Sequence, residues 1–306
     1  MPAPAYFFAA DLGGTKLSVA LVRADGRIVA RRSEPVETAS RLTPVGQMAR
    51  MAGELRARCG NVKLSAAGAA VPGLVRRDGT VWAPNLPGWT AVPLAKLLSA
   101  ELRAPVVVES DRNAGVLGET WRGAARGARD AIVLMVGTGI GAGILSGGSL
   151  VRGAHELSGC AGWIAFATES NADAKRCGQL ESLAAGPGLA KLNGANSAEE
   201  LAAAARAGDH DARRAFESAG ERLGLAVANL ISLFDPSVIV LSGGLSHAAD
   251  LFLPSLQRMA REHAQPLSAP KVKIVVSKLG SEANVLGVAR LAIERVNLAA
   301  KKKARR

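Results

Sequence analysis

The 306-residue sequence has few aromatic residues, few cysteines and little charge, and each scarcity narrows what the chain can be. Aromatic residues make up 4% of it, so its cores must be built mainly from Ala, Val and Leu. Its three cysteines form no C-x-x-C pair, which argues against a disulfide scaffold and against a self-contained zinc site. Hydrophobic residues make up 48% and charged residues 21%, which is typical of a folded chain long enough for two domains.

The sequence shows no sign of a membrane or secreted protein. No run approaches the roughly 20 apolar residues that span a bilayer, and the N-terminus "MPAPAYFFAADLGG" lacks the basic region of a signal peptide. We therefore expect a soluble, cytoplasmic protein. Of the net charge of +12, five positive residues lie in the C-terminal "KKKARR", which we interpret as a solvated, frayed end. A nucleic-acid or membrane-surface role is the weaker alternative, because no aromatic residue is interleaved there to stack on bases.

An acid and two glycines, Asp11, Gly13 and Gly14, separate the first two apolar runs in "FFAADLGGTKLSVALV". One interpretation is an ordinary β-hairpin, because glycine supplies positive φ in tight turns. The other is a phosphate site, in which the glycines let a phosphate approach backbone N–H groups and Asp11 holds a hydrated Mg²⁺ beside it. The P-loop pattern G-x-x-x-x-G-K-[ST] is absent, so a phosphate site here would belong to another architecture.

Hydrophobic patterning predicts an internal duplication. Strands are expected near residues 6–11, 16–22, 27–36, 63–71 and 105–111, and helices near 43–59, 93–103 and from 113 onward. The order then recurs, with strands over 131–151, helices over 178–207 and 210–234, strands over 237–244 and 271–279, and a closing helix over 283–298. Repeated β-β-β-α-β-α units indicate two related α/β domains.

Glycine-rich turns follow β-runs at three places in this order. They are Gly13-Gly14-Thr15, Gly137-Thr138-Gly139 and Gly243-Gly244. Two similar hairpins, one per domain, can hold one polyphosphate through backbone amides in a cleft between the domains. The third glycine pair can receive another part of the same nucleotide.

With these pieces in place, the chain resembles the ROK family of sugar kinases. The matching segments run in family order over nearly the whole sequence: "DLGGTK", "VPGLV", "PNLPGW", "VVVESDRNAGVLGE", "GTGIGAGI", "LVRGA", "LESLAAGPGLA" and "LSGGL". The resemblance implies a two-domain, actin-like ATPase (ribonuclease H-like) α/β fold. Its domains would be residues 1–115 with 287–306, and residues 116–286. ROK repressors carry an N-terminal helix-turn-helix domain, whereas the first motif here begins at Asp11, so the resemblance favours the kinase branch; a homodimer is common in the family.

The resemblance also implies roles for particular residues. The cofactor-binding positions are Asp11 near Mg²⁺, then Gly13, Gly14, Thr15, Lys16, Gly137, Thr138 and Gly139 on phosphate, and Gly243 and Gly244 on the adenosine end. Asp111 is the catalytic base, which suits a reaction that needs a proton acceptor for a sugar hydroxyl. The expected sugar contacts include Gly73, Asn85, Ser110, Asp111 and Glu181. Asp111 has an alternative interpretation as a helix N-cap, and Glu181 as an acid on a helix surface.

The match fails where many ROK kinases have a structural zinc site. Their G-E-I-G-H segment and C-x-C-G-x-x-G-C cluster correspond here to "SGCAGWIAF" and "DAKRCGQLES". The Glu position is Cys160, the His position is Trp163, and the final Cys position is Gln179; the Asn before the base is replaced by Ser110. In the family this Glu and His also help to hold the sugar, so the resemblance implies sugar contacts at Cys160 and Trp163. Two soft ligands without a His cannot form the usual closed zinc site, so we expect none. Trp163 either stacks on a sugar ring or packs into the core, and core packing is the interpretation favoured by the sequence.

These observations predict a kinase that uses ATP and Mg²⁺ to phosphorylate a hexose, with glucose as the default. The alternatives are a kinase for another sugar, such as an N-acetylhexosamine, mannose or fructose, and a non-catalytic sugar- or nucleotide-binding regulator. The retained Asp111 favours a kinase, because a pure sensor needs no base.

Overall fold

The computed structural model describes residues 5–168 and 170–304, and these fall into two compact units. Unit 1 comprises residues 1–123, 154–156 and 281–306, and unit 2 comprises residues 124–153 and 157–280. The boundaries of the units thus lie at 123 and 281, whereas the sequence-based domains ended at 115 and resumed at 287. The shift follows from helices α3 (Asp111–Arg122) and α10 (Glu282–Ala304), which pack against each other and stay whole within unit 1.

Unit 1 is built on a five-stranded sheet in the order β3-β2-β1-β4-β7. Its strands are β1 (Tyr6–Leu12), β2 (Lys16–Arg23), β3 (Ile28–Pro35), β4 (Leu64–Val71) and β7 (Val106–Ser110). The first three strands are antiparallel, as the expected hairpins require, and β1, β4 and β7 are parallel. The parallel strands are apolar on both faces, because helices cover both sides of this part of the sheet.

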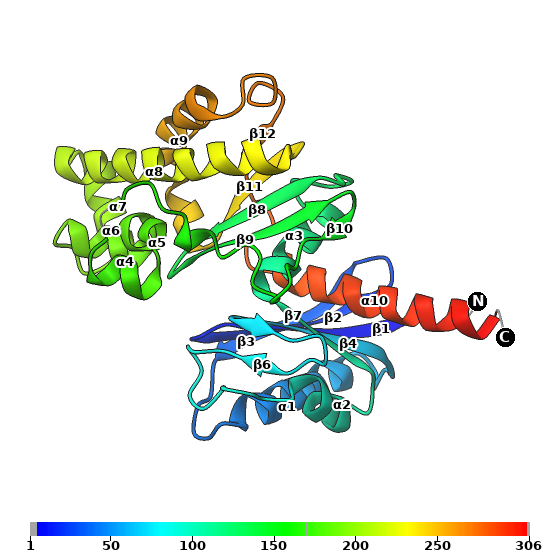
Figure 1. Cartoon of the computed structure of the whole chain (residues 1–306). Helices are drawn as coiled ribbons and strands as arrows, with labels where there is room; N and C mark the ends of the chain where they lie inside the picture. The colour runs from blue at the N-terminus through cyan, green and yellow to red at the C-terminus, as the bar shows by residue number, and fades with distance from the viewer. Residues whose placement is uncertain (1–4, 169, 305–306) are drawn as a thin grey trace. The chain divides into compact units, whose positions relative to one another are not determined.

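Helices α1 (Thr43–Arg58) and α2 (Leu94–Leu102) pack on one face of this sheet, and α3 and α10 lie on the other (Figure 1). On the second face, β4, α10 and α3 pack so closely that there is no room for a side chain between their backbones. A Cβ atom on Gly68 of β4 would lie 2.3 Å from the carbonyl oxygen of Val288 in α10. A Cβ atom on Gly287 of α10 would lie 1.8 Å from the carbonyl oxygen of Ala114 in α3. Small residues at these positions are therefore a packing requirement.

Unit 2 repeats the same sheet in the order β10-β9-β8-β11-β12. Its strands are β8 (Ala131–Val136), β9 (Ile140–Ser146), β10 (Ser149–Leu150), β11 (Val238–Ser242) and β12 (Lys273–Val276). Strands β8 to β10 are antiparallel neighbours and β8, β11 and β12 are parallel, which matches unit 1 strand for strand. The predicted duplication of the βββαβα unit is confirmed.

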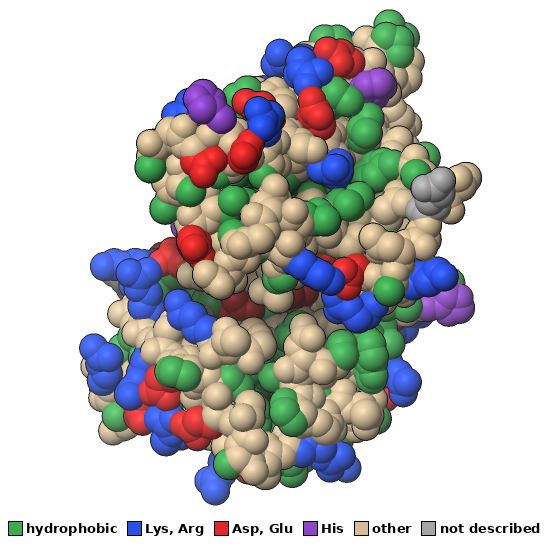
Figure 2. Space-filling model, turned by 90° about the vertical axis from the view of Figure 1, so that its left-hand side faces the viewer, with side chains coloured by type: hydrophobic (Ala, Val, Ile, Leu, Met, Phe, Trp, Pro, Cys, Tyr) green, Lys and Arg blue, Asp and Glu red, His purple; other side chains and the backbone are tan. Residues whose placement is uncertain are grey.

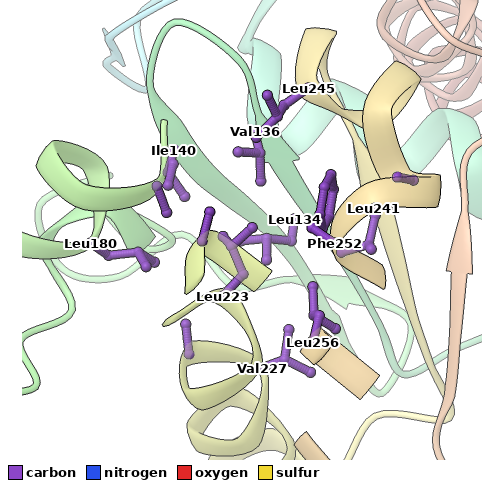
Figure 3. Close-up of a cluster of buried hydrophobic side chains, with 14 of the residues drawn as sticks. Leu134, Val136, Ile140, Leu180, Leu223, Val227, Leu241, Leu245, Phe252 and Leu256 are labelled. Atoms are coloured by element: carbon purple, nitrogen blue, oxygen red, sulfur yellow. The ribbon is translucent and has the colours of Figure 1, made fainter. Parts of the chain in front are cut away.

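The core of unit 2 lies between its sheet and the long helices α8 (His210–Phe234) and α9 (Ala249–His263). Figure 3 shows this cluster, with Leu134, Leu223, Val227, Phe252 and Leu256 among its buried side chains. The sequence analysis did not predict α9. The periodic signal was present, because Phe252, Leu256 and Ala260 are buried at intervals of one turn, but Pro254 interrupts the segment.

Two further helix predictions need correction. The single helix expected over 178–207 is three helices, α5 (Gln179–Ala184), α6 (Gly186–Leu192) and α7 (Ala198–Ala207), because Gly-Pro-Gly and Asn-Gly sequences interrupt it. The closing helix does not end near 298 in a frayed tail. Helix α10 runs to Ala304, since Ala and Lys are strong helix formers; Arg305 and Arg306 lie outside the described residues.

The remaining elements are short. They are β5 (Leu74–Val75), β6 (Val81–Trp82), α4 (Ala172–Cys177) and two 3-10 turns, η1 (Ala161–Trp163) and η2 (Gly244–Ala248). No helix of the described residues is long and apolar enough to cross a membrane.

The close contact between α3 and α10 generates a stability prediction. Gly287→Ala should lower the free energy of unfolding by about 1–3 kcal/mol, because its methyl group would overlap the Ala114 carbonyl. Gly53→Ala is the matched control, since Gly53 is an exposed residue inside α1 with no atom within 4 Å of the added Cβ atom. That control should be stabilised by about 0.5–1 kcal/mol. Equal shifts in denaturant unfolding for the two variants would show that the close approach is absent.

Candidate functional site

The polar residues predicted in the first unit meet at one edge of its sheet. Asp11 is paired across the sheet with Ala70 of β4, and Ala70 is paired in turn with Glu109 of β7. Since these three strands are parallel, the glycine hairpin after β1, Gly73 after β4 and Asp111 after β7 all lie at their carboxyl ends. Ligands of open α/β sheets bind at this edge.

Asp11 is a half-buried carboxyl group with a strongly perturbed pKa. Burial raises its pKa to about 7, and the negative charge of Asp111 adds to the effect. Asn284 of α10 opposes the shift by donating a hydrogen bond to Asp11 Oδ1 at 3.2 Å, and the charge of Lys16 opposes it less. The negative charge of Asp111 thus raises the proton affinity of Asp11, and the same negative charge makes this edge a favourable place for a divalent cation.

Asp11 and Asp111 are the candidate metal ligands at this edge of the sheet. Among residues 5–168 and 170–304, no group of three or more His, Cys, Asp and Glu side chains could hold a metal ion. A Mg²⁺ ion bound by Asp11 or Asp111 would complete its shell with water and phosphate oxygens, which is the usual arrangement for Mg²⁺ with a nucleotide.

Asp111 is the first residue of α3, but it does not cap that helix. The N-cap is Ser110, whose Oγ accepts a hydrogen bond from the Asn113 backbone N–H at 3.4 Å. The alternative interpretation of Asp111 as an N-cap is therefore wrong. Burial raises the pKa of Asp111, while the neighbouring Arg112 guanidinium lowers it. Asp111 Oδ1 accepts a hydrogen bond from the Arg112 backbone N–H at 2.8 Å, and the other carboxylate oxygen can accept a proton.

Three residues that the sequence analysis did not single out hold the turn that carries Asp111. The buried Glu109 carboxylate accepts hydrogen bonds from the Ser110 N–H and from Asn113 Nδ2, both at 2.9 Å. Arg112 Nη2 lies 3.5 Å from the carbonyl oxygen of Gly73. The sequence did contain a signal for these contacts, because Glu109 ends an apolar strand. An acid at such a position is expected to be buried, and a buried acid needs hydrogen-bond partners nearby.

The remaining sugar and phosphate candidates of unit 1 lie around the glycine hairpin. Gly13 N–H donates to the Lys16 carbonyl at 2.9 Å, so the segment is a true β-hairpin. A Cβ atom on Gly14 would lie 3.8 Å from Cβ of the exposed Asn85. Thr15 and Lys16 are also exposed beside it. Gly73 has φ +90° and leaves no room for a side chain, because its Cβ atom would lie 2.3 Å from the Trp82 carbonyl oxygen.

In unit 2 the two predicted glycine loops border one cavity. Gly137 and Gly244 are adjacent, since a Cβ atom on the first would lie 3.4 Å from the amide nitrogen of the second. The cavity has a volume of about 320 Å³ and is lined by Gly137, Thr138, Gly186, Pro187, Asn196, Ser197, Ala198, Glu199, Gly244 and Leu245. Gly139 and Gly243 are not among the lining residues. Gly243 has φ +89°, and its Cβ atom would lie 2.4 Å from the Val136 carbonyl oxygen.

The loops around this cavity are fixed by buried neighbours. Val136 and Ile140 flank the loop 137–139, and Leu245 follows Gly244; Figure 3 shows all three in the core cluster. The Gly137 carbonyl also accepts a hydrogen bond from the Gly186 N–H at 2.8 Å. The sequence did not indicate the contribution of Asn196, Ser197 and Glu199 to the lining, because these residues follow in a separate loop and helix.

Three sugar candidates of unit 2 lie near the start of α5. Glu181 is half-buried, and its Oε2 accepts a hydrogen bond from the Ile140 N–H at 2.7 Å, so it is not simply an acid on a helix surface. Cys160 is half-buried and precedes η1. The side chain of Trp163 is 58% exposed, so the favoured prediction that it packs in the core is wrong. A three-residue turn presents it outward, and the core is filled instead by Ile164 and Phe166.

Acidic and basic side chains are mixed on the part of the surface that Figure 2 shows. Arg50, for example, pairs with Glu34 at 2.7 Å and with Glu37 at 2.8 Å, and Arg206 pairs with Asp250 at 2.7 Å. These basic side chains are therefore paired with acids and do not form a continuous positive patch among themselves.

Solved structures define the class of fold. The ROK hexokinase from Thermus thermophilus superposes with a TM-score of 0.81 at 29% identity, covering 95% of this chain and 99% of that one. A ROK family glucokinase from Streptomyces griseus, solved with glucose and AMPPNP, gives a TM-score of 0.77 at 27% identity, covering 94% and 99%. The predicted actin-like ATPase fold is confirmed.

Sequence comparisons define the family. The model described as ROK family matches residues 7–295, and the chain belongs to that family. The bifunctional enzyme NanE/NanK of Brucella suis is 36% identical over 293 residues, which is 92% of this chain but only 52% of the relative, so the chain spans about half the length of that enzyme. The glucokinase of Thermotoga maritima is 30% identical over 94% of this chain and 96% of its own. A protein named xylose repressor from Caldicellulosiruptor bescii is 32% identical over 72% of this chain and 60% of its own.

The pKa of Asp11 generates a prediction about stability and pH. The folded pKa of about 7 lies above the ordinary 3.8, so the folded state keeps a proton that the unfolded state loses. The wild-type protein should therefore lose stability as the pH rises from about 4 to about 7. Asp11→Asn cannot ionise, so its melting temperature should rise relative to that of the wild type across this window, by on the order of 5 °C.

Asp25→Asn is the matched control for this measurement. Asp25 is exposed, and a backbone hydrogen bond from Arg27 lowers its pKa, so it stays ionised above pH 5 in both states. Its melting temperature should follow that of the wild type between pH 5 and 8. A constant difference between Asp11→Asn and the wild type over pH 4–7 would contradict the raised pKa.

Proposed function

We propose that this chain is an ATP- and Mg²⁺-dependent sugar kinase, with glucose as the default substrate. The observation that carries the proposal is the pair Asp11 and Asp111 at the carboxyl edge of the first sheet, both with a raised pKa and neither used as a helix cap. Membership of the ROK family and likeness to proteins named glucokinase and hexokinase support it.

Asp111 is the proposed catalytic base. In the reaction it accepts the proton of a sugar hydroxyl, whose oxygen forms the new bond to the γ-phosphorus while ADP leaves. Its burial supports this role, because a desolvated carboxylate holds a proton more readily than an exposed one. Glu109 and Asn113 keep the turn before it in place through their hydrogen bond of 2.9 Å.

The remaining parts of the proposal concern phosphate and nucleotide. Mg²⁺ supplies charge neutralisation for the phosphates, and Asp11 is the residue that would hold it through water. Backbone amides of Gly14, Thr15, Lys16, Thr138 and Gly139 are the proposed phosphate donors. Gly13 and Gly137 would shape the two loops instead, because their N–H groups donate to the carbonyls of Lys16 and Gly139 at 2.9 and 3.0 Å. The cavity beside Gly137 and Gly244 is the proposed nucleoside site, and its volume of about 320 Å³ is within the usual range of ligand pockets.

An N-acetylhexosamine is the second candidate substrate. NanK is an N-acetylmannosamine kinase, and the relative that contains it is 36% identical to this chain. The exposed indole of Trp163 also favours a sugar with an apolar face or an acyl group, since Cys160 and Trp163 replace the polar grip expected from the resemblance. Mannose and fructose remain alternatives, as does a regulator, because one relative is named a repressor. A homodimer stays a prediction.

One screen tests the function and the choice of sugar together. ADP release is measured with Mg²⁺ and ATP over a panel of hexoses, hexosamines and N-acetylhexosamines. A kinase predicts sugar-dependent ADP release with at least one member of the panel. ADP release no faster than with ATP alone, from folded protein that binds nucleotide, would favour the regulator.

The assignment of Asp111 generates a prediction for catalysis. Asp111→Asn should lower kcat by about 10²-fold or more, because the amide keeps the shape of the side chain but cannot accept the proton. Asp209→Asn is the matched control, since Asp209 also stands at a helix start and caps α8 through the N–H groups of Asp211 and Ala212. Asn caps equally well, so that variant should keep the kcat of the parent. Near-normal turnover in folded Asp111→Asn would exclude it as the base.

The altered cysteine region generates a prediction for metal content. Purified protein should contain no stoichiometric zinc, and EDTA should leave its melting temperature unchanged in the absence of nucleotide, because the thiols of Cys160 and Cys177 have no His partner in the sequence motif. Elemental analysis is the measurement. About one zinc per chain would overturn this interpretation.

A further inference from the structure

The side chain of Gln179 makes an unusual set of hydrogen bonds at the start of α5. Its Oε1 accepts from two successive backbone N–H groups, those of Phe166 and of Ala167, the latter at 3.1 Å. Its Nε2 donates to the Ala167 carbonyl at 3.3 Å. One carboxamide thus binds the backbone of two neighbouring loop residues as both acceptor and donor, through its separate oxygen and nitrogen atoms.

The loop that Gln179 binds is also attached to the body of unit 2 at this contact and just before it. Ile164 and Phe166 pack against the core, and the Ile164 carbonyl accepts a hydrogen bond from the Leu180 N–H at 3.2 Å. Gly178, with φ +95°, lies against the same loop, since its Cβ atom would be 2.2 Å from the Gly162 carbonyl oxygen. The segment from 162 to 167 therefore rests directly on the first turn of α5.

The same turn of α5 also reaches the second glycine hairpin. Glu181 Oε2 accepts the Ile140 N–H at 2.7 Å, and a Cβ atom on Gly139 would lie 2.8 Å from that oxygen. Trp163, by contrast, is 58% exposed and gains little from its own burial. The position of the Trp163 side chain must therefore be set by the backbone of its loop rather than by packing of the indole. Gln179 is the side chain best placed to set it, because it joins the loop after Trp163 to the helix that carries Glu181.

We propose that Gln179 is a positioning residue, whose carboxamide holds the loop 162–167 on α5 and so fixes Trp163 and Glu181 for sugar binding. The proposal rests on the proposed sugar kinase function. This role needs no metal ion. The hydrogen bonds of the Gln179 amide attach the loop to α5, as a coordinated metal ion could otherwise do. The sequence analysis had treated Gln179 only as a missing zinc ligand.

The experiment compares three variants in two measurements. Gln179→Ala removes the three hydrogen bonds described above, whereas Gln179→Glu keeps the oxygen that accepts from Phe166 and Ala167. Gln265→Ala is the matched control, because Gln265 Oε1 also accepts two backbone N–H groups, those of Leu267 at 2.7 Å and Ser268 at 2.9 Å, in a loop outside the proposed site. If Gln179→Ala does not fold, Gln179→Asn takes its place, since it keeps the amide but shortens its reach.

The first measurement is amide hydrogen exchange without any ligand. Gln179→Ala should speed exchange of the Phe166 and Ala167 amides by about tenfold or more, while Gln179→Glu should stay near the parent. Gln265→Ala should speed exchange only at Leu267 and Ser268. Unchanged exchange at Phe166 and Ala167 in Gln179→Ala would show that the carboxamide does not hold the loop and would overturn the proposal.

The second measurement separates sugar binding from the rest of the reaction. Gln179→Ala should raise the KM for sugar by about tenfold, with kcat and the KM for ATP within about twofold of the parent. Gln179→Glu should recover most of the sugar KM, and Gln265→Ala should leave it unchanged. Faster exchange with an unchanged sugar KM would show that the loop does not serve the sugar, and the positioning role would then be wrong.

Failure of the proposed function would be recognised separately. If the parent turns over no sugar, the kinase proposal fails, while hydrogen exchange still decides whether Gln179 holds the loop. Sugar dissociation constants from calorimetry then take the place of KM. A weaker affinity in Gln179→Ala but not in Gln265→Ala would support the positioning role in a sugar-binding protein, and equal affinities, or no sugar binding at all, would overturn it.

Discussion

Parallel pairing of β1, β4 and β7 in one register is the constraint on which the proposed chemistry depends. It brings the ends of three distant sequence segments to one edge of a sheet, and so places Asp11 and Asp111 where their charges interact. Side chains could not create this arrangement alone, because two neighbouring half-buried carboxylates repel each other. The apolar strands and the close packing of α10 on β4 must hold it. Asn284 of α10 then contributes directly to the site, as a hydrogen-bond donor to Asp11.

The second unit uses the same sheet for a different purpose. The ends of β8 and β11 carry backbone loops rather than acids, and each loop is anchored by apolar neighbours such as Val136, Ile140 and Leu245. Such loops can offer N–H groups to a ligand at fixed positions without the cost of ordering them at binding. Duplication of one unit has thus given two related edges, one acidic and one built from backbone amides.

Much of this could be predicted from the sequence, because the signals were local. Alternating and continuous apolar runs gave the strands, and Gly-containing turns between them gave the hairpins. The order of motifs indicated the duplication and the family. The Asp111 turn was harder. Its position at a helix start suggested a cap, and only the structure shows that Ser110 performs that role.

The sequence could not indicate contacts made across long separations. Asn284 meets Asp11 from the other end of the chain, and Gln179 meets the backbone of a loop that has no motif of its own. Trp163 was misjudged for a related reason. A large aromatic residue is usually buried, but the backbone of η1 directs this one outward. Three glycines packed against carbonyl groups, Gly68, Gly118 and Gly287, likewise look like flexible positions until the helices that cover them are seen.

The proposed reaction is transfer of the γ-phosphate of ATP to a sugar hydroxyl at the acidic edge of unit 1. Phosphorus NMR of the protein with Mg²⁺, ATP and the best sugar from the screen tests it most directly. We expect one sugar phosphate formed for each ATP consumed, and no such product with Asp111→Asn. ATP consumed only to inorganic phosphate, or sugar bound with no phosphate ester formed, would contradict it.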